Sequence, residues 1–291
     1  MISSSLELKK MIQILFTILV SFININTVLS KNANYEIYAI KFAEVGSTQP
    51  LSGMVLNAPA SEQLKPIFMY WLLKGNNGKN IIVDTGFLGD IEQVKTFGII
   101  NYVRPDLMLQ ELGLKASDIT DIIVTHPHWG HVGGVSLYPN ANVWIQKKDY
   151  YYFVTDAWQK NGRGGFNKED VLKLMKLNIE GKLFFIDGDD KVILPNIKVF
   201  TGSRHTFESQ YVMVENDKNN IIIASDNVFT YYNLNNLMSA PNHATFDIIA
   251  YVKEMERMKT FVKDILFIIP GHDDLFFSKF PKISNHIVRI D

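Results

Sequence analysis

The chain of 291 residues contains no cysteine. This absence excludes disulfide bonds, thiolate ligands for zinc and a cysteine nucleophile, so any bound metal must rest on histidine and carboxylate side chains. An excess of either charge is also missing, because 29 basic and 30 acidic residues give a net charge of -1. Without a basic patch or a charge run, the composition gives no support for nucleic acid or an anionic membrane surface as a partner.

Long hydrophobic runs are absent except near the N-terminus. There, Lys9 and Lys10 precede the apolar stretch MIQILFTILVSFI, which is followed by polar residues and then by Val28 and Ser30. This pattern predicts a signal peptide over residues 1–30, and hence export to the periplasm or the medium. The alternative is a membrane anchor, but the run is short for a span of about 20 residues. After cleavage we expect no stable membrane insertion.

The remainder, residues 31–291, alternates short apolar runs with helical stretches. Strands are predicted where β-branched runs end at a polar or glycine-containing turn: residues 80–86, 121–126, 142–146, 211–216, 220–226 and 265–272. Runs that are apolar at nearly every position are typical of sheets covered on both faces. Residues 167–177, with Asn167 as N-cap, and residues 246–264 are predicted as amphipathic helices. Because no repeat or long linker is apparent, we interpret residues 31–291 as one α/β domain.

Three of the seven histidines lie close together in the segment HPHWGH, residues 126–131. His126 and His128 are two residues apart, so on an extended loop both imidazoles point the same way and can bind one ion. The glycines after position 129 ease a turn that can bring His131 to a neighbouring position. The alternative is a surface histidine cluster that binds metal only adventitiously.

Three further polar residues stand at the ends or starts of predicted strands. His205 lies just before a strand in GSRHTFES, Asp226 ends IIIASD, and His272 follows IIPG. Layered α/β folds gather functional groups at strand ends on one edge. This arrangement favours a metal site over a surface cluster. His243 and His286 have no such setting, and we interpret His286 as a surface residue and His243 as a loop residue that could line a pocket.

The order of the motifs VDTG, THPHWGHVGG, RHTFES, ASDN and PGHD resembles that of the metallo-β-lactamase-fold hydrolase superfamily, over roughly residues 35–290. The resemblance implies a four-layer αββα sandwich, with two β-sheets face to face, helices outside and a metal site at one sheet edge. By position it assigns the first metal to His126, His128 and His205, the bridging role to Asp226, and the second metal to His131 and His272. It also makes Asp84 of VDTG a buried residue that orients a ligand. We expect Zn²⁺, with other divalent cations as alternatives.

Gly130 departs from this superfamily's motif, His-x-His-x-Asp-His, because it stands where the aspartate normally is. Glycine has no side chain with which to bind a metal, so the second site loses an anionic ligand that would also have held and deprotonated the attacking water. We therefore expect a complete first site and a weakened second one. Rescue by Asp273, Asp274 or Glu208 is conceivable, although GHD is usual in related hydrolases.

The chemistry that we expect is hydrolysis of a small-molecule ester, lactone, thioester, amide or phosphoester, because a metal with an open position lowers the pKa of bound water to about 7 and polarises a carbonyl. The aspartate at the bridging position argues against the true β-lactamases, and a missing glutamate in the first motif argues against the oxygen-reducing branch. The segments around Asp226 and His272 most resemble the branch that contains N-acyl-homoserine lactonases.

In such lactonases an assisting tyrosine lies three residues past the bridging aspartate. Here that position is Phe229, which cannot donate a hydrogen bond. Tyr231 and Tyr232 lie nearby, and Tyr231 is our candidate, with Asp226, for a catalytic role. The segment KKDYYYFVTDAW, residues 147–158, forms either an aromatic wall for an acyl chain or ordinary core packing.

Two functions from different classes stay open. The first is an exported, metal-dependent, lactonase-like hydrolase, which the surviving ligand positions favour. The second is a degenerate member of the superfamily, marked by Gly130, that binds metal or a small ligand with little or no catalysis. The sequence specifies neither the native substrate nor the oligomeric state.

Overall fold

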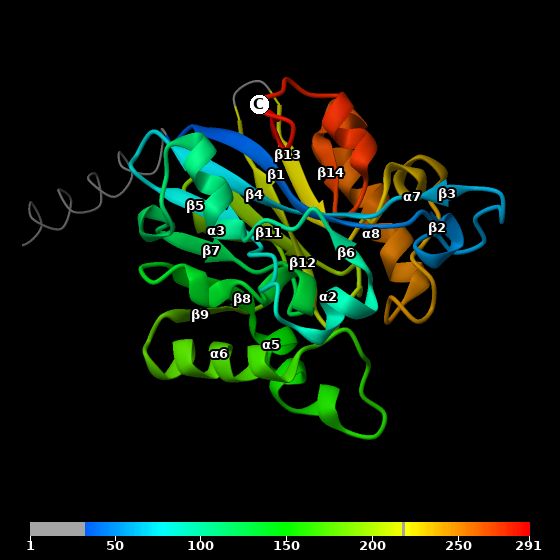
Figure 1. Ribbon diagram of the computed structural model, residues 1–291, viewed down its shortest axis with the longest axis horizontal. Helices are drawn as coiled ribbons and strands as arrows, with labels where there is room; N and C mark the ends of the chain where they lie inside the picture. Colours follow the sequence, from blue (N-terminus) through cyan, green and yellow to red (C-terminus); the bar gives the residue numbers. More distant parts are fainter. Residues whose placement is uncertain (1–32, 217–218) are drawn as a thin grey trace, which may run out of the picture.

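The computed structural model describes residues 33–216 and 219–291, and the predicted signal peptide over residues 1–30 lies outside them. Within the described ranges, two β-sheets pack face to face and helices cover both outer faces (Figure 1). This arrangement confirms the four-layer αββα sandwich. No helix in these ranges is long and apolar enough to cross a membrane.

The larger sheet has eight strands. Seven follow the order β15 (Ile287–Arg289), β1 (Tyr35–Val45), β4 (Ile67–Gly75), β5 (Asn80–Val83), β7 (Asp121–Ile123), β8 (Asn142–Gln146) and β9 (Leu183–Ile186), and β6 (Ile99–Ile100) pairs with β1. The run from β5 to β9 is parallel, whereas β1, β4 and β15 pair antiparallel. The carboxyl ends of β5 and β7 therefore lie at the same sheet edge.

The second sheet has five strands. Their order is β10 (Lys191–Leu194), β11 (Ile197–Thr201), β12 (Gln210–Val214), β13 (Ile221–Ser225) and β14 (Ile268–Pro270). Strands β13 and β14 are parallel, so their carboxyl ends also share an edge. A separate pair is formed by β2 (Gln49–Pro50) and β3 (Gln63–Leu64).

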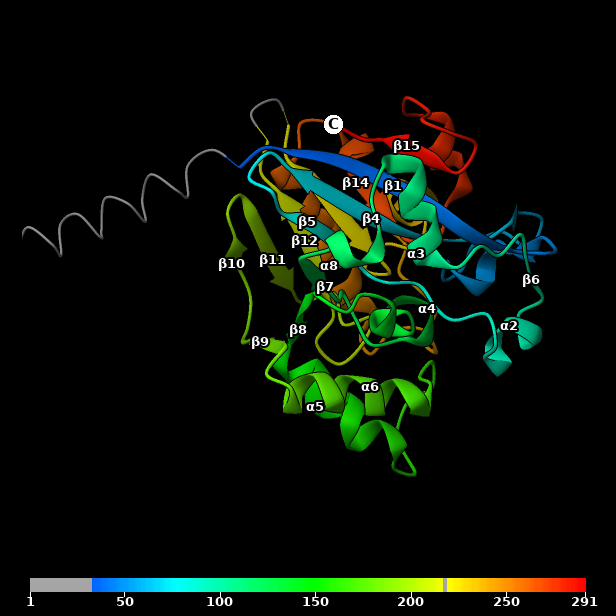
Figure 2. The ribbon, with the colours of Figure 1, turned by 60° about the vertical axis from the view of Figure 1, so that its left-hand side comes forward.

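The α-helices are short, and α8 is the longest in the described part of the chain. They are α2 (Glu92–Thr96), α3 (Pro105–Met108), α4 (Trp129–Val132), α5 (Lys147–Val154), α6 (Lys168–Ile179), α7 (Tyr231–Asn236) and α8 (Ile248–Phe261). Helices α5 and α6 lie beside β8 and β9 at one end of the larger sheet (Figure 2). Helix α8 packs on the outer face of the second sheet, where Tyr251, Met255 and Met258 join its hydrophobic cluster.

Strand β13 illustrates why the strand sequences are apolar at every position. Its residues Ile221 and Ile223 pack between the two sheets, whereas Ile222 and Ala224 face α8 on the outside. Successive side chains of a strand point to opposite faces, so a sheet that is covered on both sides needs apolar residues at odd and even positions alike. The observed burial confirms that prediction.

The predicted elements differ from the observed ones mainly at their ends. Residues 265–267 form a 3₁₀ turn rather than the start of a strand, because the Asp264 carboxylate accepts a hydrogen bond from Leu266 N and caps that turn. Helix α6 is capped as predicted, with the Asn167 side chain accepting from Glu169 N. The prediction omitted β1 and β4, the longest strands of the described part.

Candidate metal centre

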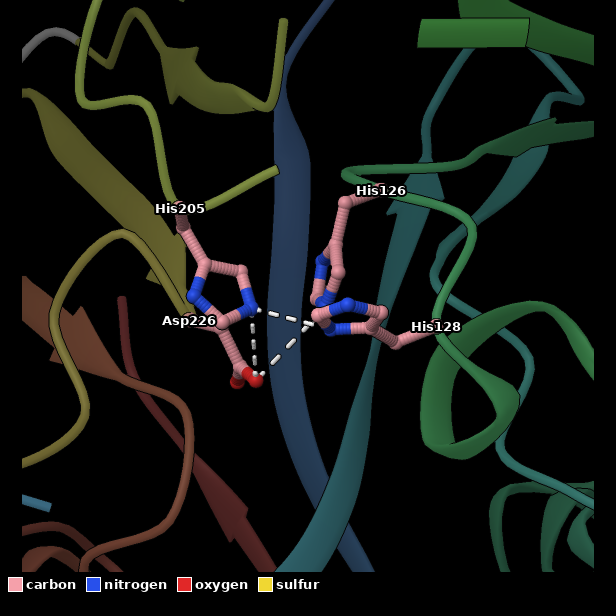
Figure 3. Close-up of side chains that lie close together, drawn as sticks. All are labelled: His126, His128, His205 and Asp226. Carbon is pink, nitrogen blue, oxygen red and sulfur yellow. Dashed lines mark hydrogen bonds and ion pairs between the residues drawn. The ribbon is translucent and has the colours of Figure 1, made fainter. Parts of the chain in front are cut away.

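The predicted ligands come from both sheets and meet at one edge. His126 and His128 follow β7, and they face His205 and Asp226 from the second sheet (Figure 3). Asp226 directly follows β13, His205 lies between β11 and β12, and His272 follows β14 after one residue. The order of polar residues at strand ends thus predicted which side chains come together.

The first donor group consists of His126, His128, His205 and Asp226, whose ligand atoms all lie within 4.8 Å of one another. His205 Nε2 lies 3.1 Å from His128 Nδ1 and 3.4 Å from Asp226 Oδ2. His126 Nε2 lies 3.6 Å from the same carboxylate oxygen. Three imidazoles and one carboxylate around a common point are a usual ligand set for a divalent transition metal.

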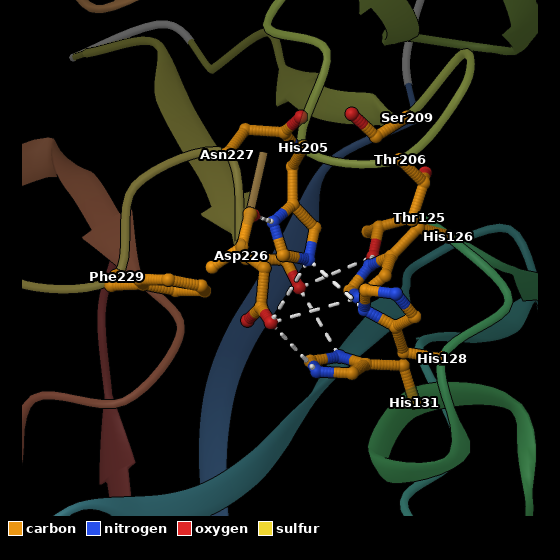
Figure 4. Close-up of polar contacts among 12 residues, drawn as sticks. Thr125, His126, His128, His131, His205, Thr206, Ser209, Asp226, Asn227 and Phe229 are labelled. Atoms are coloured by element: carbon orange, nitrogen blue, oxygen red, sulfur yellow. Dashed lines mark hydrogen bonds and ion pairs between the residues drawn. The ribbon is translucent and has the colours of Figure 1, made fainter. Parts of the chain in front are cut away.

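The second donor group consists of His131, Asp226 and His272, again within 4.8 Å. His131 Nε2 is 3.3 Å from Asp226 Oδ2, and His272 Nε2 is 3.0 Å from Asp226 Oδ1. Asp226 is therefore shared by both groups (Figure 4). The second group has one imidazole fewer than the first, and no carboxylate of its own.

Burial and neighbouring charges set the protonation of these residues. Burial lowers the pKa of His126 and His128 well below the usual value and lowers that of His205 to about 4, so all three are neutral near pH 7. Burial alone would raise the pKa of Asp226, but His131 and His272 hold it well below the usual range. Neutral imidazoles and an ionised carboxylate are the forms that bind metal.

One buried atom tests whether the residues fit a metal. His126 Nε2 is buried without a hydrogen-bond partner, and its nearest oxygen, on Asp226, is too distant for a hydrogen bond. An unpaired buried nitrogen costs free energy that a bound cation would recover. The donor set and this unpaired nitrogen therefore fit a divalent cation held by His126, His128, His205 and Asp226.

Asp84 is hydrogen-bonded to His131 and to two residues that directly precede candidate ligands, in line with the orienting role that the resemblance implied. It is fully buried, and its Oδ2 accepts from Thr125 Oγ1 and Ser225 Oγ, both at 2.8 Å, and lies 2.9 Å from His131 Nδ1. Burial alone would lower the pKa of His131, but the carboxylates of Asp226 and Asp84 raise it to about 10. Thr125 and Ser225 were not predicted as part of the centre, although each directly precedes a candidate ligand.

The backbone beside the ligands adopts a conformation that non-glycine residues rarely take. Asp84, Arg204 and Ser225 have φ values of 61°, 61° and 49°. Arg204 directly precedes His205, and Ser225 directly precedes Asp226. Left-handed backbone costs of order 1–3 kcal/mol per residue and is concentrated at functional sites.

None of the three predicted replacements, Asp273, Asp274 and Glu208, takes the place of the carboxylate missing at Gly130. Asp273 accepts from Tyr231 N and Leu275 N, and Asp274 pairs with Lys41. Glu208 pairs with Lys148 and Arg204. The second donor group therefore stays one anionic ligand short, as expected from the sequence.

The Tyr231 side chain, predicted to assist the reaction, points away from the metal centre. The Tyr231 hydroxyl donates to Leu266 O at 2.9 Å, and the residue does not line the cavity at the metal centre. Tyr232 packs in a small cluster with Leu51 and Val55 instead. Phe229 does face the centre, with its ring centroid 5.2 Å from that of His205. Phe229, which stands where the lactonases have their assisting tyrosine, therefore lies beside the centre but has no hydroxyl to donate a hydrogen bond.

A cavity of about 600 Å³ opens onto both donor groups. Its lining is mainly apolar and includes Met54, Leu64, Phe68, Phe97, Trp129 and Phe229. Gln49, Thr96 and His243 add polar atoms, and among its lining residues there is no lysine or arginine. His243 lies in the loop before α8, as predicted, and it also lines this cavity.

The aromatic segment of residues 147–158 packs in the protein and does not line this cavity. Tyr152 stacks on Phe207 with ring centroids 5.1 Å apart, and Phe153 is fully buried. Asp149 of the same helix accepts from Thr206 Oγ1 at 2.6 Å and from Glu208 N at 3.1 Å. The segment therefore supports the loop that carries His205, which favours packing over an acyl-chain wall.

The family profile described as "Metallo-beta-lactamase superfamily" matches residues 68–272. An N-acyl homoserine lactonase of Bacillus cereus is 27% identical over 169 residues, which are 57% of this chain and 60% of that protein, so the match spans less than two thirds of that relative. An N-acyl homoserine lactonase of a Bacillus species is 26% identical over 72% of this chain and 81% of its own length.

A solved structure with the same fold is an N-acyl homoserine lactone hydrolase with the product N-hexanoyl-L-homoserine bound at its catalytic metal center. It superimposes with a TM-score of 0.67 at 20% sequence identity, over 84% of this chain and 96% of that one.

Proposed function

Because the chain belongs to the metallo-β-lactamase superfamily, we propose that it is a metal-dependent hydrolase that opens a lactone or a similar neutral ester. The observation that carries this proposal is the complete first donor group, facing a cavity lined mainly by apolar side chains. The lactonases among its relatives support the same substrate class. We propose Zn²⁺ as the cation, with other divalent metals as alternatives.

The residues of the centre have separable roles. His126, His128 and His205 would hold the cation, and Asp226, kept ionised by His131 and His272, would be shared with the second group. A bound divalent cation would activate water and polarise the substrate carbonyl. Asp84 and its hydrogen bonds keep the His131 ring in place.

The lining of the cavity narrows the substrate class. A phosphodiester or a carboxylate-bearing β-lactam would bring negative charge into a cavity whose lining residues include no lysine or arginine. Apart from the bound cation, such a charge would find no cationic lysine or arginine in the lining, and a poorly compensated charge is costly. An uncharged lactone or ester with an apolar substituent matches the lining, so we place it ahead of the other reactions that the centre could catalyse.

The test is zinc content measured together with hydrolysis of a panel of lactones, esters, phosphodiesters and β-lactams. We expect tightly bound zinc, turnover of a lactone or ester, and loss of turnover on chelation. His205→Ala should lose both the zinc affinity, by at least about tenfold, and the turnover. His286→Ala is the matched control, because His286 is exposed and lies outside both donor groups. Absence of bound zinc, or turnover that resists chelation, would contradict the proposal.

The missing carboxylate at Gly130 favours a second candidate, a family member that binds metal or a small ligand without useful catalysis. The same panel separates the two functions. Tight zinc binding combined with no turnover of any substrate would support the degenerate protein, whereas chelator-sensitive turnover would support the hydrolase.

We further propose that the hydrolase domain, residues 31–291, is exported after removal of residues 1–30. The two lysines before the apolar run of the N-terminal segment support this proposal. Mass spectrometry of the protein recovered outside the cytoplasm of a bacterial host should give a mature N-terminus near Lys31. Recovery of the uncleaved chain from membranes would favour the anchor instead.

A further inference from the structure

Gly130 faces the ring of Phe68, from a different part of the chain. A Cβ atom added at Gly130 would lie 3.2 Å from Phe68 Cε1 and 3.5 Å from Phe68 Cδ1. Apart from its own helical turn and chain neighbours, no other residue lies within 4 Å of that position. A side chain at position 130 would therefore touch the edge of the Phe68 ring, which would have to give way by a few tenths of an ångström.

The Phe68 ring has little freedom to move away. It is 8% exposed, and its centroid lies 5.1 Å from that of Phe87, 5.3 Å from that of Trp129 and 6.3 Å from that of Phe42. Rings packed at this density yield only with rearrangement of their neighbours, which commonly costs about 1–3 kcal/mol. The contact at Gly130 is thus set by a packed aromatic cluster rather than by one mobile side chain.

The same ring also borders the second donor group. Phe68 and His272 are perpendicular, with ring centroids 5.3 Å apart, and His272 Nδ1 is 2.7 Å from Ile67 O, one residue before Phe68. Phe68 therefore contacts both Gly130 and His272. On the side of the second group where a carboxylate from position 130 would add a ligand, there is hydrocarbon instead.

We propose that Phe68 and Gly130 form a steric pair that keeps the second cation position weak, so that one cation is bound tightly and only at the first donor group. This inference rests on the proposed function, because it assumes that the centre binds a divalent cation. A second dication would share the single negative charge of Asp226 with the first, and an aromatic ring can neither coordinate it nor neutralise it. Restoring the second position should therefore require changes at both residues.

The experiment is zinc titration of the metal-free protein against a chromophoric chelator, with elemental analysis after dialysis. The proteins are the wild type, Gly130→Asp, Phe68→Leu/Gly130→Asp and Tyr102→Leu/Gly130→Asp. The last is the matched control, because Tyr102 belongs to the same aromatic cluster but packs on Phe42 and Phe87 rather than on Phe68.

We expect one tight zinc per chain in the wild type. Gly130→Asp alone and its Tyr102→Leu combination should change zinc affinity at the second position by less than about threefold, because the Phe68 ring still opposes the new side chain. Phe68→Leu/Gly130→Asp should tighten it by about 10–100-fold, the range typical of a gained or lost partner at a metal site. Affinity at the first position should stay the same in all four proteins.

Two tight zinc ions in the wild type would overturn the inference and leave the proposed function intact. Equal tightening in Gly130→Asp alone would overturn the role of Phe68, as would equal tightening in the Tyr102→Leu control. No tight zinc at all in the wild type would defeat the proposed function itself. The number of zinc ions bound by the wild type tests the inference even if a variant fails to fold. Leucine in place of an aromatic residue keeps the cluster apolar, which favours folding of the double variants.

Discussion

Gly271 is the position at which a single methyl group should disable the metal centre. It directly precedes His272, and a Cβ atom there would lie 2.4 Å from Asp226 Oδ1. The Ser225 backbone closes the other side, with its carbonyl carbon at 3.0 Å and its carbonyl oxygen at 3.1 Å. We therefore expect Gly271→Ala to displace the Asp226 carboxylate rather than the backbone.

The size of the effect follows from the geometry. Restoring ordinary van der Waals separation requires the carboxylate to move by about 1 Å, whereas metal–ligand distances tolerate only about 0.2 Å. A displacement of about 1 Å at a catalytic centre can cost about 100-fold in rate. We expect that loss in kcat/KM, with at least a tenfold loss of zinc affinity, and an overpacking cost of about 1–3 kcal/mol in stability.

Zinc affinity by chelator competition, kcat/KM on the best substrate of the panel and urea unfolding together check this prediction. Gly53→Ala is the control for zinc affinity, because a Cβ atom there has no neighbour within 4 Å. If folded Gly271→Ala bound zinc within threefold of the wild type, the aspartate would not be required at its observed position, and the reasoning would be refuted.

Two other substitutions test the surroundings of the centre. Asp84→Asn should lower zinc affinity by about 10–100-fold, since the amide cannot accept from Thr125, Ser225 and His131 as the carboxylate does; an unchanged chelator competition curve would contradict this role. Burial raises the pKa of Asp149 to about 7, so this group stabilises the fold at low pH and loses that contribution as the pH rises from about 4 through 7. Asp149→Asn should therefore unfold in urea with a flatter dependence on pH over that range, and parallel curves would count against the shift.

The local residue pattern predicted a large part of the fold and of the centre. The β-branched runs that end at His126 and Asp226 predicted buried strands with functional ends, because an apolar strand followed by a polar residue is a property of a few consecutive residues. The family motifs then indicated six candidate ligands and Asp84, and the structure brings the six together in two groups that share Asp226, with Asp84 beside His131. The gap at Gly130 was also visible, since glycine has no donor atom in any fold.

Hydrogen bonds between residues far apart in the chain could not be predicted from the local residue pattern. Nothing near Tyr231 indicates that its hydroxyl donates to Leu266 O, and nothing near Asp273 indicates that it is held by Tyr231 N and Leu275 N. The direction of a side chain depends on which segments pack beside it, and the sequence pattern carries no record of that packing.

The sequence by itself therefore determined the chemistry of the protein: nitrogen and oxygen ligands without thiolates, in an order that the family shares, with one carboxylate absent. Only the tertiary structure decided what stands in the place of that carboxylate. Phe68 belongs to a strand that is hydrophobic and buried from Ile67 to Leu73, so its residue type suggests core packing alone. Its contact with Gly130 exists because β4 and α4, which are distant in the chain, meet at the same sheet edge. Close packing there accommodates either the Phe68 ring or a carboxylate at position 130, but not both without rearrangement.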